Sequence, residues 1–201
     1  MPEAHAGCPA LIGPNAILQL LPVLVSRLGA ARTHDLLTLA QLDDVPDGST
    51  MIPQGDAARL HRAVRVHEPQ QAERLLHAAG ENTGRYILAH RIPGFVQAVL
   101  KILPAALAAR LLSRAIARHA WTFAGSGQFR AVTPWRFELV GNPLIAGEHA
   151  DYPLCAWHRA VFLSLYRVLV SADVECTEET CGAGSVAGCC RFVLWRKQVA
   201  A

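Results

Sequence analysis

The spacing of apolar residues changes near Trp121, and this change limits the chain to folds in which helices precede a sheet. Upstream, apolar residues recur at helical spacing, as in Ile17, Leu21, Leu24 and Leu28. Downstream, strand-like segments surround one expected helix from about 154 to 170; the segments are FRAVTPWRFELVGN, ADVECTEE and CCRFVLWRK. Helices followed by antiparallel strands are typical of an α+β domain.

The upstream part predicts several helices divided by glycine and proline. We expect helices from Asn15 to Gly29, from near Thr33, after a cap at Asp56, and from Pro69 with a break at Gly80 or Gly84. A loop rich in turn residues spans 44–56. The last helix of this part runs from Gly94 to about Ala120 with a kink at Pro104.

Size and composition fit one globular domain. The chain has 201 residues, of which 52% are hydrophobic and 17% charged, so it can bury a core. We expect a single domain over 1–201, with N-terminal helices in 1–120 packed with a small antiparallel sheet in 121–201. The net charge of +3 is too small to indicate a nucleic-acid partner.

No segment predicts a signal peptide or a membrane-spanning helix. The first apolar run has no basic residues ahead of it, and Pro22 interrupts it. Lys101, Pro104 and Arg110 divide the most apolar region into pieces shorter than a spanning helix requires. We therefore expect a cytoplasmic protein, and a position at the periphery of a membrane stays open.

The segment CTEETCGAGSVAGCC holds four of the six cysteines and a glycine pattern, G-x-G-x-x-A over 182–187. In dinucleotide-binding proteins this pattern joins a strand to a helix whose N-terminus faces the pyrophosphate. Here the following segment predicts a strand, and few residues remain for a βαβ unit. We therefore interpret the glycines as a tight loop between two strands.

The cysteines admit two interpretations, a metal site or buried strand residues. Thiolates favour zinc, which takes four ligands in closed structural sites. Pairing of the two strands would bring Cys181 close to Cys189 or Cys190, with Glu178 nearby and Cys155 available from the preceding helix. Free cysteine is also among the most buried residue types, and three disulfides are uncommon in a reducing compartment.

Several motifs together resemble the bacteriochlorophyll 4-vinyl reductase family of photosynthetic bacteria. These are IGPNAILQLLPVL, RYILAHRIP, VQAVLKILPAALAARLL, AIARHAWTFAGSG, NPLI, CAWHRAVFLSLYRVLV and the closing C…C-R-F. The resemblance covers nearly the whole chain. It implies the 4-vinyl reductase domain, a ligand-binding fold shared with vesicle-transport-particle subunits and with aromatic-responsive sensors, and often dimeric.

The resemblance also implies a zinc ligand set. In the related sensors, zinc is held by a cysteine at a helix start, a glutamate and two cysteines flanking a hairpin loop. The matching positions are Cys155, Glu178, Cys181 and the cysteine before Arg-Phe, which is Cys190. The usual loop spacing of eight favours Cys189 instead. Adjacent strand residues point to opposite faces, so we expect only one of the two to be a ligand.

A tetrapyrrole ligand requires cations, an apolar slot and often an axial ligand. Arg110, Arg114 and Arg118 recur every four residues along one helix face, which fits either anionic propionates or an ordinary solvated stripe. The candidates for an axial ligand of magnesium are His119 and His158, because a neutral imidazole can bind the ion. Either histidine could equally be a structural residue that forms hydrogen bonds. Expected pocket aromatics, which core packing would explain equally well, are Trp121, Trp135 and Phe137.

Three functions follow from the resemblance. The first is a homodimeric, zinc-containing protein that binds a magnesium porphyrin or chlorophyllide intermediate and carries it to other bacteriochlorophyll-synthesis enzymes. The second is the vinyl reductase of the family name, which requires a hydride source such as NADPH. The third is a ligand-sensing module, although 201 residues leave little room for an output domain.

Overall fold

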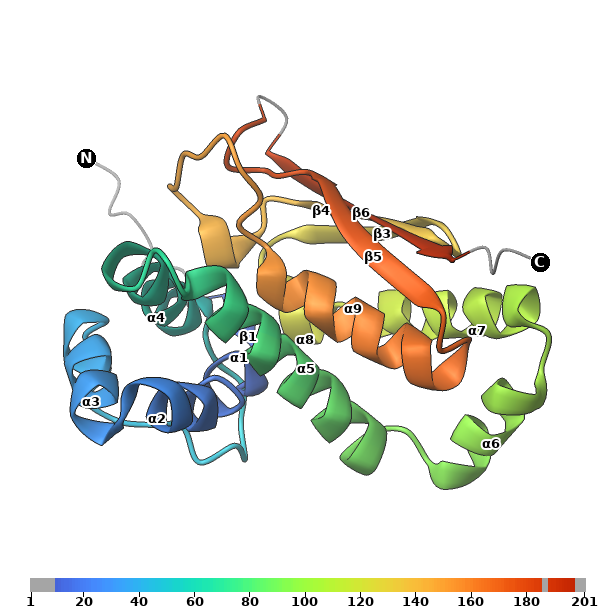
Figure 1. Cartoon of the computed structure of the whole chain (residues 1–201), viewed down its shortest axis with the longest axis horizontal. Helices are drawn as coiled ribbons and strands as arrows, with labels where there is room; N and C mark the ends of the chain where they lie inside the picture. Colours follow the sequence, from blue (N-terminus) through green and yellow to red (C-terminus); the bar gives the residue numbers. More distant parts are fainter. Residues whose placement is uncertain (1–9, 186–187, 198–201) are drawn as a thin grey trace, which may run out of the picture.

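The computed structural model describes residues 10–185 and 188–197 and shows helices followed by a sheet (Figure 1). The α+β class expected from the sequence is confirmed. The helices before the sheet are α1 (Asn15–Leu18), α2 (Leu21–Leu28), α3 (Ala30–Leu39), α4 (Gln54–His67), α5 (Ala72–His90), α6 (Gly94–Ile102), α7 (Ala105–Arg118) and α8 (Trp121–Ala124). Two short strands, β1 (Leu11–Ile12) and β2 (Ile52–Pro53), pair antiparallel among them.

The main sheet has four antiparallel strands in the order β3-β4-β6-β5. Two hairpins build it, β3 (Gln128–Thr133) with β4 (Arg136–Val140), and β5 (Val174–Thr180) with β6 (Cys189–Arg196). Between the hairpins lie the 3-10 turn η1 (Pro143–Ile145) and helix α9 (Ala156–Leu169). The β5–β6 pairing expected from the sequence is therefore present.

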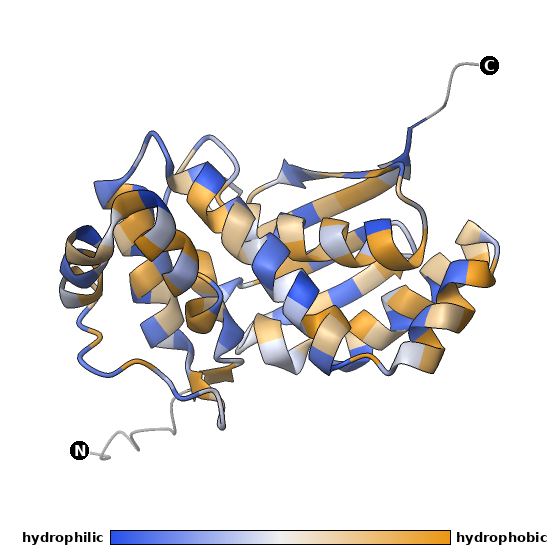
Figure 2. Ribbon diagram, turned by 60° about the horizontal axis from the view of Figure 1, so that its bottom comes forward, coloured by the Kyte–Doolittle hydropathy of each residue, from blue (hydrophilic) through white to orange (hydrophobic). Residues whose placement is uncertain are grey.

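Helix α9 packs against one face of this sheet and forms the centre of the molecule (Figure 1). Phe162 of α9 contacts Phe137 on β4 and Phe192 on β6, with ring centroids 5.1 Å and 5.2 Å apart. Hydrophobic residues lie on the helices and strands where the two layers face each other (Figure 2). The buried apolar residues of the helices and the sheet form one continuous cluster.

Helix α5 runs unbroken along α9, contrary to the break expected at Gly80 or Gly84. A Cβ on Gly80 would lie 2.3 Å from the carbonyl oxygen of Trp157, and one on Gly84 would lie 2.5 Å from the side chain of Ser164. These glycines therefore allow the two helix backbones to approach closely, and they do not interrupt the helix.

Proline divides two helices that the sequence pattern predicted as continuous. The helix expected from Asn15 to Gly29 is split into α1 and α2, because Pro22 cannot donate to the carbonyl of Leu18 and its ring crowds that carbonyl. Likewise Pro104 separates α6 from α7 where a kink was expected, and Leu103 before it is extended.

Smaller differences concern helix starts and the first hairpin. Helix α3 begins at Ala30, before Thr33, whereas α5 begins at Ala72, after Pro69. Helix α4 begins at Gln54, so Asp56 lies in its first turn and pairs with Arg59 there instead of capping it. The segment FRAVTPWRFELVGN is a hairpin whose turn contains Pro134. Within 10–185 and 188–197, no helix is long and apolar enough to cross a membrane.

Candidate functional site

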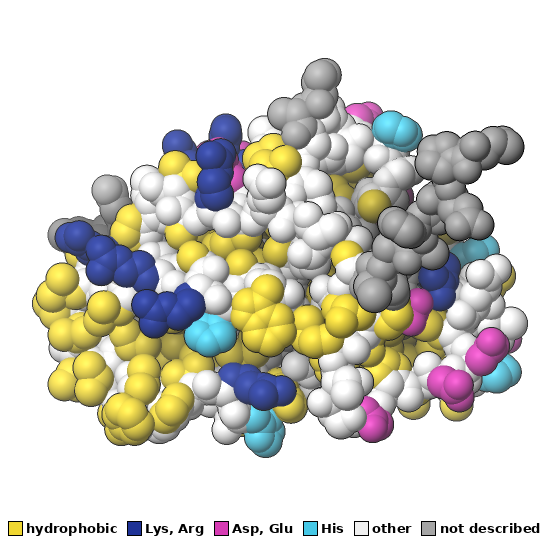
Figure 3. Space-filling view, turned by 180° about the vertical axis from the view of Figure 1, so that it is seen from behind, with side chains coloured by type: hydrophobic (Ala, Val, Ile, Leu, Met, Phe, Trp, Pro, Cys, Tyr) yellow, Lys and Arg dark blue, Asp and Glu magenta, His cyan; other side chains and the backbone are white. Residues whose placement is uncertain are grey.

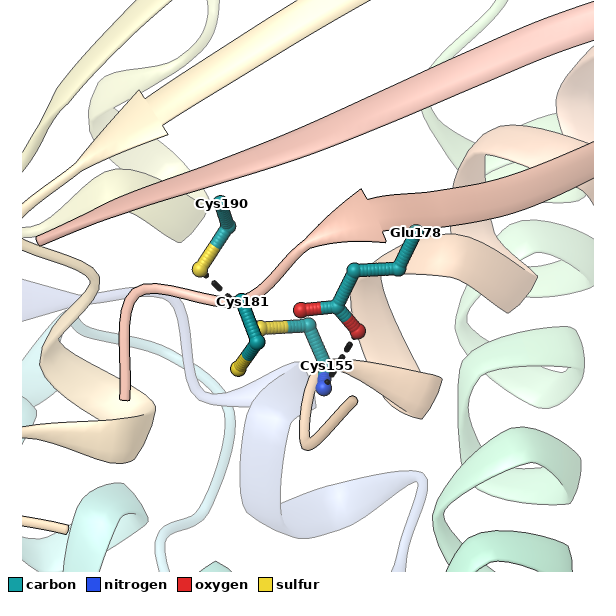
Figure 4. Close-up of side chains that lie close together, drawn as sticks. All are labelled: Cys155, Glu178, Cys181 and Cys190. Carbon is teal, nitrogen blue, oxygen red and sulfur yellow. Dashed lines mark hydrogen bonds between the residues drawn. The ribbon is translucent and has the colours of Figure 1, made fainter. Parts of the chain in front are cut away.

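Four side chains converge where α9 begins beside the β5–β6 hairpin (Figure 4). They are Cys155, Glu178, Cys181 and Cys190, and one ligand atom from each lies within 4.8 Å of all the others. The sulfur atoms of Cys155 and Cys190 are 3.2 Å apart. We call these four residues the cysteine cluster.

Local structure explains why these residues meet. Cys155 occupies the N-cap position of α9, and Cys181 directly follows β5. Glu178 on β5 and Cys190 on β6 both face the buried side of the sheet. Because side chains alternate along a strand, Cys189 points to the other face and lies outside the cluster. Of the two cysteines left open by the sequence, the structure brings in Cys190.

Asn142 supports the cluster, and sequence reasoning missed it. Its side-chain amide is buried and donates to the sulfur of Cys155 at 3.2 Å and to that of Cys190 at 3.8 Å. Its oxygen accepts from the backbone N–H of Leu144, which fixes the orientation of the amide. The backbone N–H of Gly182 donates to Cys190 at 3.3 Å. Such donors stabilise thiolate over thiol.

Burial makes negative charge costly for part of the cluster. Burial raises the pKa of Glu178 to about 8 and raises the pKa of the Cys155 thiol well above its usual value. Hydrogen bonds from the thiols of Cys155 and Cys190 lower the pKa of Cys181, so the thiolate form is favoured there. One oxygen of Glu178 accepts from the backbone N–H of Cys155 at 2.9 Å, while the other is buried without a partner among the described residues.

This donor set fits a divalent metal ion. A cation would stabilise the ionised carboxylate and thiolates that burial disfavours, and it would give the second Glu178 oxygen a partner. Three sulfurs and one oxygen suit zinc, whose tetrahedral sites with bonds of about 2.3 Å space their sulfurs by roughly 3.8 Å. Cys176 is buried on β5 outside the cluster, and Cys8 lies outside the described residues.

The candidate ligand-binding residues of α7 and α8 lie on the surface. Arg110, Arg114 and Arg118 are exposed along α7 and form no ion pair with any residue in the described ranges. His119 follows them, with its Nδ1 2.9 Å from the carbonyl oxygen of Ala115. Trp121, two residues later, is 58% exposed. These five exposed residues of α7 and the segment after it are here called the α7 face.

The structure places the other three candidates away from that face. Phe137 is fully buried against Phe162, and Trp135 is half-buried against Tyr166. His158 is buried among aromatic rings, and this burial lowers its pKa to about 4, so the imidazole is neutral. All three therefore belong to the core or its margin, because α9 and the sheet close over them.

The glycine pattern lies in the loop of the β5–β6 hairpin, and Val186 and Ala187 within it lie outside the described residues. Glycines that follow the strand of a dinucleotide site must lead into a helix. Here β6 begins at Cys189 and pairs antiparallel with β5. The pattern therefore has the context of a β-hairpin, as the sequence predicted.

Solved structures of similar fold are H-NOX domains. The H-NOX protein from S. oneidensis in its Fe(II)NO state matches with a TM-score of 0.58 at 11% identity, covering 93% of this chain and 100% of that one. An Fe(II) unliganded H-NOX mutant from K. algicida matches with a TM-score of 0.57 at 9% identity, covering 93% and 97%. At this identity the likeness concerns the fold alone.

Sequence comparison identifies much more similar proteins, although no family model matches the chain. The bacteriochlorophyll synthase 23 kDa chain of Cereibacter sphaeroides is 47% identical over 196 residues, covering 95% of each chain. The protein of the same name from Rhodobacter capsulatus is 46% identical over 188 residues, covering 92% of this chain and 87% of that one. The chain therefore belongs to the family of the bacteriochlorophyll synthase 23 kDa chain.

Proposed function

We propose that this protein binds a magnesium tetrapyrrole intermediate of bacteriochlorophyll biosynthesis and carries it between enzymes. Family membership supports a role in this pathway, because both relatives are named as chains of bacteriochlorophyll synthase. The H-NOX family, which shares the fold, is known for its heme. A porphyrin is therefore a ligand class that suits both the pathway and the fold.

The observation that carries the proposal is the arrangement of His119 and Trp121. If Nδ1 of His119 donates to the Ala115 carbonyl, Nε2 keeps its lone pair and faces outward from an exposed side chain. A hydrogen bond of this kind fixes the tautomer of metal-ligating histidines. Trp121 then offers an exposed aromatic surface two residues away, on which a planar macrocycle can pack.

The arginines of the α7 face supply the charge that the ligand requires. Arg114 and Arg118 are one helical turn apart on α7, and Arg118 directly precedes His119. Guanidinium groups bind carboxylates through paired hydrogen bonds, so the two arginines suit the carboxylate groups of a porphyrin or chlorophyllide. Without an anionic ligand, the positive charges of these two arginines would repel each other.

The site chemistry favours a carrier over the vinyl reductase suggested by the sequence resemblance. Reduction of a vinyl group requires a hydride donor, and the glycine pattern that resembles a nucleotide cradle lies in a hairpin loop. Zinc in the cysteine cluster would have no redox chemistry. A vinyl reductase would therefore need a separate hydride donor or a reducing partner protein to reduce the bound ligand.

We assign zinc a structural role in this function. Bound by Cys155, Glu178, Cys181 and Cys190, it would fasten the start of α9 to the β5–β6 hairpin. The layer of α9 on the sheet supports α7, which contacts both α9 and β3. Metal binding would therefore stabilise the α7 face, although the metal itself would not contact the ligand.

The test compares variants of the α7 face in titrations with magnesium protoporphyrin, followed by absorption spectroscopy. We expect His119→Ala to weaken binding about tenfold or more and to shift the absorption bands, because the axial ligand is lost. The matched control is His34→Ala, which removes an exposed histidine of α3 and should change nothing. Equal affinities and spectra for both variants and the unmodified protein would contradict the proposed site.

A further inference from the structure

Helix α6 exposes an apolar face that no described residue covers. Phe95, Val99 and Ile102 recur every three or four residues on this nine-residue helix, and they are 73%, 47% and 82% exposed. Only Leu100 of α6 is buried, and the main contact of the helix is with α9. Exposed apolar clusters of this kind mark interaction sites.

The apolar surface continues from α6 onto α7. Leu107 and Leu111, one turn apart on α7, are 48% and 47% exposed. Figure 3 shows yellow side chains gathered at the lower left of the molecule, with dark blue side chains along their upper edge. Figure 1 shows α6 and α7 at the right-hand end of the molecule, with α6 along its lower edge. We call these two helices the α6–α7 arm.

The arm lies within a stretch of sequence that has no acidic residue. Residues 82–137 contain eight basic side chains and no aspartate or glutamate, whereas the rest of the chain carries eleven basic and sixteen acidic side chains. The basic residues are Arg85, Arg91, Lys101, Arg110, Arg114, Arg118, Arg130 and Arg136. The modest net charge of +3 therefore combines a positive stretch of sequence, of which Lys101, Arg110, Arg114 and Arg118 lie on the arm, with a negative remainder.

We propose that the α6–α7 arm docks on the surface of a bilayer that contains anionic lipid. Phe95, Val99 and Ile102 would enter the boundary between head groups and acyl chains, as the apolar face of an interfacial helix does. Lys101 and Arg110 would contact lipid phosphates, whereas Arg114 and Arg118 belong to the tetrapyrrole site proposed above. This surface is distinct from His119 and Trp121, which lie beyond the other end of α7.

The charge of the arm disfavours a second copy of the chain as its partner. A symmetric interface would place the same basic surface of two copies face to face, with no acidic residue in 82–137 to neutralise either one. Phe95 and Ile102 also project from the arm, each with most of its side chain exposed. Projecting apolar side chains suit a fluid hydrocarbon layer, which needs no matching pocket.

The experiment is co-sedimentation of the unliganded protein with vesicles of two compositions. One set contains phosphatidylcholine alone, and the other contains equal amounts of phosphatidylcholine and phosphatidylglycerol. We expect binding to the anionic vesicles that weakens with added salt and is much weaker on the neutral ones. Absence of binding, or equal binding to both compositions, would overturn the proposal. Because no tetrapyrrole is present, the result is independent of the proposed carrier function.

Variants distinguish insertion of the apolar side chains of α6 into the bilayer from non-specific adsorption of the protein. The double variant Phe95→Ser with Ile102→Ser should weaken binding to anionic vesicles by roughly tenfold or more, because the buried apolar area is lost. The matched control is Val66→Ser, which removes an exposed apolar side chain of α4 and should leave binding unchanged. Equal binding by the double variant and the control would overturn the proposal.

The contribution of the basic side chains is tested by the same co-sedimentation assay. Lys101→Gln should weaken binding about fivefold, whereas Arg27→Gln on α2, outside the acid-free stretch, should have little effect. The mass in solution is measured without lipid for every variant. If the unmodified protein is a dimer and the double variant a monomer, the α6 face is an interface between copies, and the membrane proposal is contradicted.

Discussion

The sulfur of Cys155 lies 3.2 Å from the sulfur of Cys190, although 35 residues separate them in the chain. This contact joins the N-cap of α9 to the central part of the sheet, where β6 pairs with both β4 and β5. Glu178 and Cys181 complete the cluster from β5 and the residue after it. A metal held there would add a further link between the start of α9, β5 and β6, which the Cys155–Glu178 hydrogen bond and the pairing of the two strands already join.

Substitution of Cys190 should lower the zinc content, whereas substitution of its neighbour Cys189 should not. Cys190→Ser should lose most of the bound zinc, because a thiolate facing the cluster is removed. Cys189→Ser should keep one zinc per chain, because that side chain lies on the other face of β6. Metal analysis of the purified proteins measures this directly. Zinc in the Cys190 variant at the level of the unmodified protein would contradict the ligand assignment.

Asn142 should tune metal affinity without being a ligand. Asn142→Ala removes the amide that donates to Cys155 and Cys190, and we expect zinc affinity to fall by about 10- to 100-fold. Competition with a zinc-binding dye measures the affinity. Asn82→Ala serves as control, since its amide contacts the carbonyl of Gln19 away from the cluster. If the two variants bind zinc equally well, Asn142 has no role in the site.

Close packing of α5 on α9 predicts a difference between two glycines. Gly80→Ala should lower the free energy of unfolding by about 1–3 kcal/mol, because its Cβ would lie 2.3 Å from the Trp157 carbonyl. Gly94→Ala on α6 meets no atom within 4 Å and should change stability by roughly 0.5 kcal/mol or less. Urea unfolding compares the two, and equal stabilities would show that the helices have room to separate.

His61 should make the protein less stable in acid. It is fully buried on α4, and burial lowers its pKa to about 3 from an ordinary value of 6.5. Nearby Arg65 and His158 act in the same direction, against a hydrogen bond to the Ala16 carbonyl. The unfolded chain therefore takes up a proton as pH falls below 6.5, while the folded chain does not until about pH 3. Stability is highest above pH 6.5 and declines below it.

The variant His61→Gln isolates this contribution, because glutamine can keep a donor to Ala16 but does not titrate. Between pH 7 and pH 5, the unmodified protein should lose about 2 kcal/mol more stability than the variant. Chemical unfolding at the two pH values measures the difference. A variant that loses as much stability as the unmodified protein would show that His61 is not the group responsible.

The order of helices and strands could be predicted because the apolar residues recur at helical spacing in the helices and at alternate positions in the strands, and these residues are the buried ones. Helix α9 and the β5–β6 hairpin were predicted within a few residues for this reason. The end of α1 at Leu18 was missed although Pro22 marks it, and at Pro104 only a kink was expected where α6 in fact ends and α7 begins. The role of Gly80 could not be predicted, since its close approach to α9 is a tertiary contact that leaves no local pattern.

The cysteine cluster was predictable because hairpin pairing and family resemblance pointed to the same residues. The choice between Cys189 and Cys190 required the register of β6, which loop spacing does not define. Asn142 has no spacing signal and is recognised only by its position between two sulfurs. The acid-free stretch over 82–137, by contrast, is visible in the sequence and was overlooked because the total charge is small.

The most direct test of the proposed function is an anaerobic titration of the zinc-loaded protein with a divinyl magnesium tetrapyrrole, with and without NADPH. Absorption spectra measure binding, and product analysis measures vinyl reduction. We expect saturable binding of one ligand per chain and no monovinyl product under either condition. Monovinyl product that depends on NADPH would contradict the carrier function and establish the reductase instead.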